Sequence, residues 1–197
     1  MNKTTNRSCC RPTQFRAFEN EGKKKIECYF AVFDDVYRWA DKCTETIDTH
    51  AFDETINDDI RALINHDTSL VLGRTAANTL RLSIDAKGLK GEIDINEQDQ
   101  DALNLYARVQ RGDVNQCSFG FEILEEEFSE NNGNYNWHIK KVRLYEVSIV
   151  TFPAYEGTEA NARSERKPIL TDIWKKRTKE RLENVKTAYA GKEARNS

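Results

Sequence analysis

Three side chains in the sequence have the types that a hydrolase needs: a histidine, a serine and a carboxylate. His66 is one of only three histidines, with His50 and His138, so few groups could act as a base near neutral pH. It follows an apolar run that ends at Asn65, where a strand end would hold its backbone rigidly. A capping or surface histidine explains the same local pattern and is the commoner case.

Ser118 lies in the segment QCSFGF at 116–121, whose apolar residues indicate a buried strand. Gly120 shares the face of the serine and leaves room for a substrate. A serine hydroxyl is a weak nucleophile until a nearby base accepts its proton, so a small structural serine is the simpler interpretation of the hexapeptide alone. Cys117 would point to the opposite face, and a cysteine nucleophile is therefore a competing hypothesis.

Glu146 occupies a strand face that is otherwise largely apolar. The expected members of this face are Val142, Leu144, Glu146, Ser148 and Val150. A carboxylate in such a row needs a hydrogen-bond donor, and an imidazole N–H is a natural one. A salt bridge to Lys140 or Arg143 would satisfy the same requirement, so both interpretations stay open.

The elements that would position these residues are mostly β-strands. Alternation of apolar and polar residues predicts strands within 15–33, 79–84, 89–95, 116–125 and 135–152. Residues 79–95 form the clearest hairpin, and residues 60–67 favour a strand that ends near His66, with a helix as the alternative. Helical spacing predicts a helix over 97–111 that Gly112 ends. Residues 51–56 are compatible with helical turns, and 34–42 with a loop or lid.

The composition indicates a folded body with a basic tail. Hydrophobic residues make up 38% and charged residues 32% of the 197 residues, which suits a single core. The net charge is −3, but residues 164–197 hold 10 Lys and Arg against 5 Asp and Glu. The remaining body is acidic and suits nucleic acid poorly. We expect an N-terminal extension at 1–14, one domain at 15–163, and a helical or disordered tail at 164–197.

The sequence also bears on compartment and cofactors. It has no apolar run long enough to cross a membrane and no secretory signal near its start, so we expect no membrane association. The five cysteines form an odd set without paired spacing: Cys9, Cys10, Cys28, Cys43 and Cys117. This set disfavours disulfides and a zinc site and fits a reducing compartment. Without a histidine pair at ligand spacing or a glycine-rich phosphate loop, no metal or cofactor is expected.

Residues 45–160 resemble the prohead maturation proteases of tailed bacteriophages, which are distant relatives in fold of the herpesvirus capsid-assembly protease, assemblin. The resemblance rests on separated motifs in the family's order: ETI with AF at 45–52, LINHD at 63–67, LGRT at 72–75, a hairpin through 88–89, RGDV at 111–114, CSFGF at 117–121, and LYEVSIVTFPAY at 144–155. It implies that His66 is the general base and Ser118 the nucleophile. Glu146 is the expected third member, because its interval after Ser118 is similar to that in assemblin.

The same resemblance implies a fold and a function. The expected fold is mainly β, an assemblin-like β-barrel flanked by a few helices. The expected activity is that of a serine endopeptidase inside the procapsid in the host cytoplasm, cleaving scaffold protein, major capsid protein and itself. A homo-oligomer is compatible with this role, and the tail beyond Arg163 would be a self-cleavage or encapsidation segment. The alternatives are a non-catalytic capsid-assembly or scaffold-binding module, and a cysteine hydrolase that uses Cys117.

The sequence departs from the family pattern at two positions outside the three proposed catalytic residues. His50 stands where a glycine usually precedes Ala51, and Cys117 stands where methionine is common. His50 could alter the local turn or serve as an alternative base.

Overall fold

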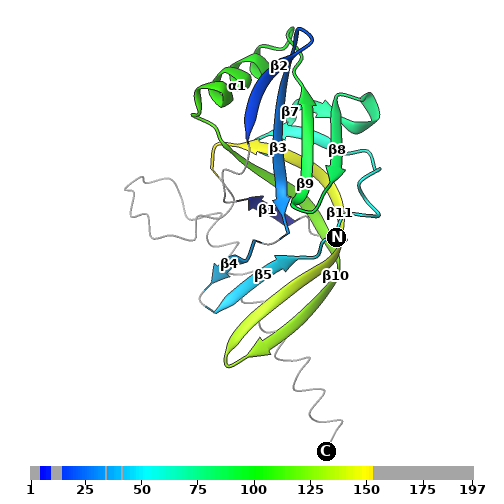
Figure 1. Ribbon diagram of the computed structural model, residues 1–197, viewed down its shortest axis with the longest axis vertical. Helices are drawn as coiled ribbons and strands as arrows, with labels where there is room; N and C mark the ends of the chain where they lie inside the picture. Colours follow the sequence, from blue (N-terminus) through cyan, green and yellow to red (C-terminus); the bar gives the residue numbers. More distant parts are fainter. Residues whose placement is uncertain (1–4, 10–14, 34, 41, 153–197) are drawn as a thin grey trace, which may run out of the picture. The chain divides into compact units, whose positions relative to one another are not determined.

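A computed structural model describes residues 5–9, 15–33, 35–40 and 42–152 of the chain (Figure 1). These residues all belong to the first of two compact units, Met1–Thr158. The expected tail at 164–197 and the expected domain boundary at 163 lie outside the described residues, and so does most of the expected extension at 1–14. Within the described ranges, no helix is both long enough and apolar enough to cross a membrane.

The described residues are dominated by strands, so the expected mainly β class is confirmed. The strands are β1 (Thr5–Cys9), β2 (Arg16–Asn20), β3 (Lys23–Val32), β4 (Tyr37–Ala40), β5 (Cys43–Ile47), β6 (Arg61–Ile64), β7 (Asp67–Arg74), β8 (Leu80–Ile84), β9 (Gly88–Asp94), β10 (Gln116–Asn131) and β11 (Asn134–Val150). The helices are α1 (Gln100–Arg111) and the short 3₁₀ helix η1 (Thr75–Ala77).

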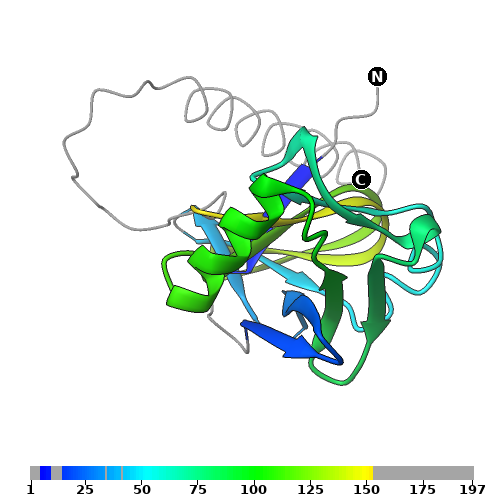
Figure 2. The same cartoon turned by 90° about the horizontal axis from the view of Figure 1, so that it is seen from above.

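The strands form two sheets with one apolar core. The larger sheet has the order β1-β10-β11-β5-β4, and β6 joins it through β11 and brings β7 with it. The smaller sheet has the order β2-β3-β9-β8, and α1 packs beside β2 and β3 (Figures 1 and 2). The core draws on both sheets and the helix, with Phe30, Leu89, Leu105, Phe119 and Val147 among its buried members. Burial of each such side chain contributes about 1.5–3 kcal/mol.

The expectation of a closed barrel with several flanking helices is wrong for the described residues. β11 pairs in parallel with β5 through residues 135–139 and with β6 through residues 146–149. The larger sheet therefore branches along β11 instead of closing on itself. Its outer strands β1, β4 and β7 each pair with one neighbour among the described strands, and α1 is the one α-helix of this part of the chain.

Two predicted elements have clear local causes. The helix α1 starts after Asp99, whose carboxylate accepts hydrogen bonds from the backbone N–H groups of Asp101 and Ala102. It ends at Gly112, which adopts the left-handed conformation (φ 89°) that favours glycine. The hairpin of β8 and β9 is confirmed within one residue of the predicted strand ends.

Two other local predictions are corrected. Residues 37–40 form the strand β4 rather than a loop or lid, because β5 provides an antiparallel partner. Residues 51–56 make hydrogen-bonded turns, with Phe52 C=O accepting from Thr55 and Ile56 N–H, and form no helix. The first outcome depends on pairing with the strand that follows, and the turns at 51–56 also accept hydrogen bonds from β11, from Val142 N–H to Ala51 C=O and from Leu144 N–H to Thr55 Oγ1.

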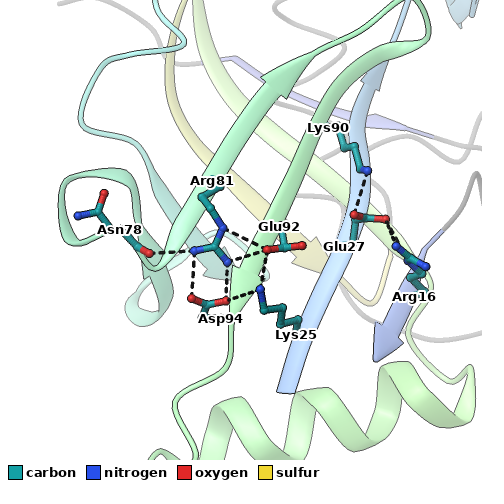
Figure 3. Close-up of polar contacts among 8 residues, drawn as sticks. All are labelled: Arg16, Lys25, Glu27, Asn78, Arg81, Lys90, Glu92 and Asp94. Atoms are coloured by element: carbon teal, nitrogen blue, oxygen red, sulfur yellow. Dashed lines mark hydrogen bonds and ion pairs between the residues drawn. The ribbon is translucent and has the colours of Figure 1, made fainter. Parts of the chain in front are cut away.

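A charge network crosses three strands of the smaller sheet (Figure 3). Arg81 on β8 donates to Glu92 Oε1 at 2.7 Å and to Asp94 Oδ1 at 2.5 Å, both on β9. Lys25 on β3 binds the same Glu92 oxygen at 2.9 Å. The hydrogen bond from Arg81 holds the pKa of Asp94 below its usual value despite partial burial of the carboxyl. The network therefore links β3, β9 and β8 in its ionised form.

Replacing Arg81 by methionine should make the protein less sensitive to acid. A carboxyl group whose pKa is lowered by folding stabilises the native state above its unfolded pKa, here 3.8, and loses that contribution as pH falls through the folded value. We expect Arg81→Met to cost about 1 kcal/mol at neutral pH and to flatten the fall in unfolding free energy below about pH 4. Urea denaturation at pH 7 and pH 3 measures this, with Lys23→Met as the control. An equal acid-induced loss in both variants would contradict it.

Candidate active site

The two faces of β10 and β11 carry different residue types. On β10, Cys117 and Phe119 point into the apolar core, whereas Ser118 and Gly120 occupy the other face. On β11 the register shifts between Leu144 and Glu146, because Glu146 pairs with Gly120 while Leu144 pairs with Phe121. Tyr145 is thus the extra residue of a β-bulge, which reverses the alternation of side chains.

Because of this bulge, Glu146 lies on the opposite strand face from the one predicted from the sequence. Val142 and Leu144 lie in the core, and so do Val147 and Ile149 beyond the bulge. Glu146 and Ser148 therefore share the opposite face with Ser118 rather than the apolar face with Leu144. Neither of the two expected salt-bridge partners binds Glu146, since Lys140 binds Asp48 and Arg143 binds Glu122.

His66 lies in the tight turn between β6 and β7. Ile64 and Asp67 are the closing pair of this hairpin, so Asn65 and His66 form a two-residue loop. Both have positive φ, 52° and 61°, as a type I′ turn requires. The strand thus ends just before His66, as the sequence predicted. Two successive non-glycine residues in this conformation store backbone strain.

Hydrogen bonds from β11 and the residue after it secure this turn. Asn65 N–H donates to Ile149 C=O at 2.9 Å, and Thr151 N–H donates to Asn65 Oδ1 at 2.9 Å. His66 N–H donates to Ser148 Oγ at 3.2 Å. β6 also runs parallel to β11 in this region, with Leu63 opposite Ser148. The imidazole is therefore supported by a rigid strand rather than by a free loop.

The structure brings His66 and Glu146 into direct contact. Nδ1 of the imidazole lies 2.7 Å from Oε1 of Glu146, and the two side chains are 22% and 13% exposed. A carboxylate accepts at this position, so Nδ1 carries a proton and the opposite nitrogen, Nε2, can accept one. Nε2 is buried and has no hydrogen-bond partner among the described residues. This is the arrangement that an oriented general base requires.

Ser118 lies on β10, next to β11, which carries Glu146, whereas His66 follows β6 on the other side of β11. Ser118 stands directly opposite Ser148 in the antiparallel β10–β11 register and is fully buried. Cβ atoms of such opposite residues are about 4.5–5.5 Å apart. Ser118 therefore shares a face with Glu146 and neighbours the residue that contacts His66. Its hydroxyl does not hydrogen-bond Nε2 here, as is common in ligand-free enzymes, where catalytic hydrogen bonds tighten upon substrate binding.

A second unsatisfied polar atom lies on this face. Gln116 precedes Ser118 by two residues on β10, and its Oε1 is buried without a hydrogen-bond partner among the described residues. Leaving a buried acceptor unpaired costs about 1–3 kcal/mol. Together with Nε2 of His66, it makes this face one that a polar ligand would complete.

Cys117, the alternative nucleophile, and His50, the alternative base, do not lie on the strand face of Ser118. Cys117 is 4% exposed in the core, and its thiol donates to Tyr29 C=O at 2.9 Å. A hydrogen bond with Cys28 and burial both raise the pKa of the Cys117 thiol well above its ordinary value, which disfavours the reactive thiolate. The His50 side chain is 80% exposed and pairs with Asp53 at 2.9 Å, on a turn rather than on the face of Ser118.

Sequence reasoning did not single out Ser148, which contacts both His66 and Glu146. Its hydroxyl lies 2.5 Å from Oε2 of Glu146 and also accepts from the His66 backbone. Its position two residues after Glu146 is the one feature of the sequence that could have indicated these contacts. A serine at that position is also compatible with an ordinary strand residue. In the part of the chain that the structure describes, no group of three or more His, Cys, Asp or Glu side chains could hold a metal ion.

Comparison with known proteins identifies the family of the chain and a solved structure with a similar fold. The solved structure of the bacteriophage T4 capsid assembly protease matches with a TM-score of 0.53 and 12% identity, covering 77% of this chain and 98% of that one, so the likeness concerns the fold. No curated protein matched the sequence. The family model of the caudovirus prohead serine proteases matches residues 12–170. The chain therefore belongs to the caudovirus prohead serine protease family, whose members mature viral capsids.

Proposed function

We propose that Ser118, His66 and Glu146 form the catalytic triad of a serine endopeptidase that matures the procapsid. The observation that carries this proposal is the 2.7 Å contact between His66 Nδ1 and Glu146 Oε1, with Nε2 buried and without a partner among the described residues. Membership of a serine protease family supports the reaction type. The strain of the His66 turn is a further mark of a functional residue.

The proposed reaction proceeds through an acyl-enzyme. Nε2 of His66 accepts the hydroxyl proton of Ser118 as its Oγ attacks the scissile carbonyl carbon, and Glu146 stabilises the imidazolium that forms. His66 then donates this proton to the leaving amine as the C–N bond breaks. Water repeats the sequence on the acyl ester, which returns Ser118 and releases the new carboxyl terminus.

The proposed substrates are polypeptides of the immature shell. The family is described as one of prohead serine proteases, and the similar T4 protein is a capsid assembly protease, which supports this choice. Scaffold protein and segments of the major capsid protein are therefore the first substrates to examine, inside the procapsid in the host cell. The basic segment at 164–197, beyond the proposed domain at 15–163, is the proposed site of self-cleavage.

A non-catalytic assembly module on the same fold is the rival hypothesis. Such a module has no need for a strained histidine with an oriented ring. The unpartnered Oε1 of Gln116 suits a bound ligand under either hypothesis, whereas an imidazole whose Nδ1 is held by a carboxylate and whose Nε2 is unpartnered suits a proton acceptor. The features of His66 therefore favour catalysis over binding alone.

Covalent labelling tests the proposed nucleophile. We expect a fluorophosphonate probe to modify Ser118, as located by peptide mass spectrometry, because this class of reagent needs a hydroxyl activated by a base. Cys117→Ala should keep the labelling, since its thiol points into the core, whereas Ser118→Ala should abolish it. Iodoacetamide should leave Cys117 of the native protein unmodified. Labelling that is lost in Cys117→Ala but kept in Ser118→Ala would support a cysteine hydrolase instead.

A further inference from the structure

A buried hydroxyl beside the proposed triad makes two hydrogen bonds that serve the base and the acid together. Ser148 is fully buried on β11 and lies on the same face as Glu146 and Ser118. Its Oγ is 2.5 Å from Glu146 Oε2 and 3.2 Å from the backbone nitrogen of His66. A hydroxyl has one donor and two acceptor positions. Ser148 thus donates to the carboxylate and accepts from the His66 N–H.

Because of these bonds, Glu146 is held through both of its oxygens. Oε1 contacts His66 Nδ1 at 2.7 Å, and Oε2 contacts Ser148. A carboxylate with one free oxygen can rotate about its terminal torsion, which is broad and roughly two-fold. The second hydrogen bond fixes the carboxylate plane and therefore the direction in which it holds the imidazole.

The other bond acts on the backbone of the base. His66 is the second residue of a turn in which both residues have positive φ, and such a turn is strained when it contains no glycine. Its N–H donates to Ser148 Oγ, so this side chain helps to keep the strained residue in place. One hydroxyl therefore fixes the ring from the carboxylate side and from the main-chain side.

The same geometry argues against Ser148 as the nucleophile. Nδ1 of His66 is engaged by Glu146, so the nitrogen that accepts a proton from the nucleophile must be Nε2. The contacts of Ser148 are with the carboxylate and with the His66 backbone, both on the far side of the ring from Nε2. Ser118, which stands across from Ser148 on β10, keeps the role of nucleophile.

We propose that Ser148 is a positioning residue that aligns Glu146 and His66 for proton transfer from Ser118. This inference rests on the proposed function. Hydrogen bonds to charged groups are strong enough that losing this one should slow the chemical step about 10- to 100-fold. The loss should appear in kcat rather than in KM, because the two hydrogen bonds of this buried hydroxyl act on the proposed base and acid.

The test measures the rate constant of fluorophosphonate labelling at Ser118 in the full chain. Ser148→Ala should lower it about 10- to 100-fold. Ser148→Thr, which keeps the hydroxyl, should retain most of the rate, whereas Ser148→Val, which has nearly the same shape as threonine, should be as slow as Ser148→Ala. The threonine and valine pair isolates the hydroxyl even if the alanine variant folds poorly. The downfield proton resonance of His66 Nδ1–H should shift or broaden in the slow variants only.

Thr55→Val is the matched control. The Thr55 hydroxyl is also buried, donates to Asp58 Oδ2 at 3.1 Å and accepts from Leu144 N–H at 2.9 Å, but it does not contact His66 or Glu146. Its removal should lower thermal stability as much as the change at Ser148 while leaving the labelling rate unchanged.

The outcomes separate this inference from the proposed function. If Ser118 is labelled and the valine and threonine variants react equally fast, the role of Ser148 is refuted and the triad stands. If Thr55→Val slows labelling as much as Ser148→Val, the effect is general destabilisation and the inference is also refuted. If the unsubstituted chain is never labelled at Ser118, the proposed function fails and this inference fails with it.

Discussion

Replacing Ser118 by alanine is expected to lower kcat/KM for peptide cleavage by about 10⁴-fold or more. The change removes the only atom that can form the acyl-enzyme in the proposed mechanism, while the small alanine leaves the buried strand intact. Cleavage of scaffold protein, of capsid protein and of the chain's own segment beyond residue 163 should be lost together. Mass spectrometry of the products after timed incubation measures all three.

A second serine on the same strand serves as the control for this experiment. Ser129 also lies on β10 but is exposed, so Ser129→Ala should cleave at the unsubstituted rate. If the Ser118→Ala variant processed these substrates as fast as the Ser129→Ala variant, the proposed serine protease mechanism would be wrong. A folded, unsubstituted chain that binds scaffold protein but never cleaves it would favour the non-catalytic module.

Replacing Glu146 by glutamine is expected to lower kcat by about 10³- to 10⁴-fold. The amide can turn its NH₂ group toward His66 Nδ1, which then accepts instead of donating. The imidazole proton moves to Nε2 in that tautomer, so Nε2 can no longer take the proton of Ser118. Single-turnover kinetics on a peptide substrate would measure the loss, and KM should change little because both Glu146 oxygens are engaged by His66 and Ser148.

The matched control changes an exposed carboxylate in the same way. Glu125 lies on the outer part of β10, and Glu125→Gln should keep full activity. Circular dichroism of both variants checks that the sheets are formed. Equal activity of the Glu146→Gln and Glu125→Gln variants would exclude Glu146 as the acidic member of the triad.

Local patterns in the sequence predicted the elements that depend on local physics. The β8–β9 hairpin alternates cleanly around a turn, and α1 has both a capping Asp99 and a terminal Gly112. The turn between β10 and β11 contains Asn132 and Gly133, both with positive φ, and both are residue types that favour such a hairpin turn. By contrast, the polar segment that contains β4 predicts a loop, because only pairing with β5 makes this segment a strand.

The sequence predicted the contact between His66 and Glu146 but not the geometry around Glu146. His66 and Glu146 are joined as expected, yet the reason given for Glu146, a carboxylate in an apolar row, is wrong. A single extra residue, Tyr145, reverses the alternation, and the apolar neighbours Leu144 and Val142 point away from Glu146. Bulges leave no reliable signal in the residue types of one strand, because they are set by the pairing with the next strand.

The branching of the larger sheet was equally hidden from the sequence. Parallel pairing of β11 with β5 and with β6 joins segments about 80 to 90 residues apart. Nothing local to these segments specifies which strands will meet. The resemblance to the assemblin fold suggested a closed barrel. Instead, β11 pairs with the short strands β5 and β6 along different parts of its length, and the sheet stays open.

The parallel alignment of β6 with β11 has a consequence for how the protein is made. His66 leaves the ribosome 80 residues before Glu146, which contacts its ring, and 82 residues before Ser148, which accepts from its backbone N–H. A nascent chain that stops before β11 has neither partner for the imidazole, and its type I′ turn lacks its supports from Ser148 and Ile149. Translation order thus delays assembly of the proposed proteolytic centre until most of the domain has been synthesised.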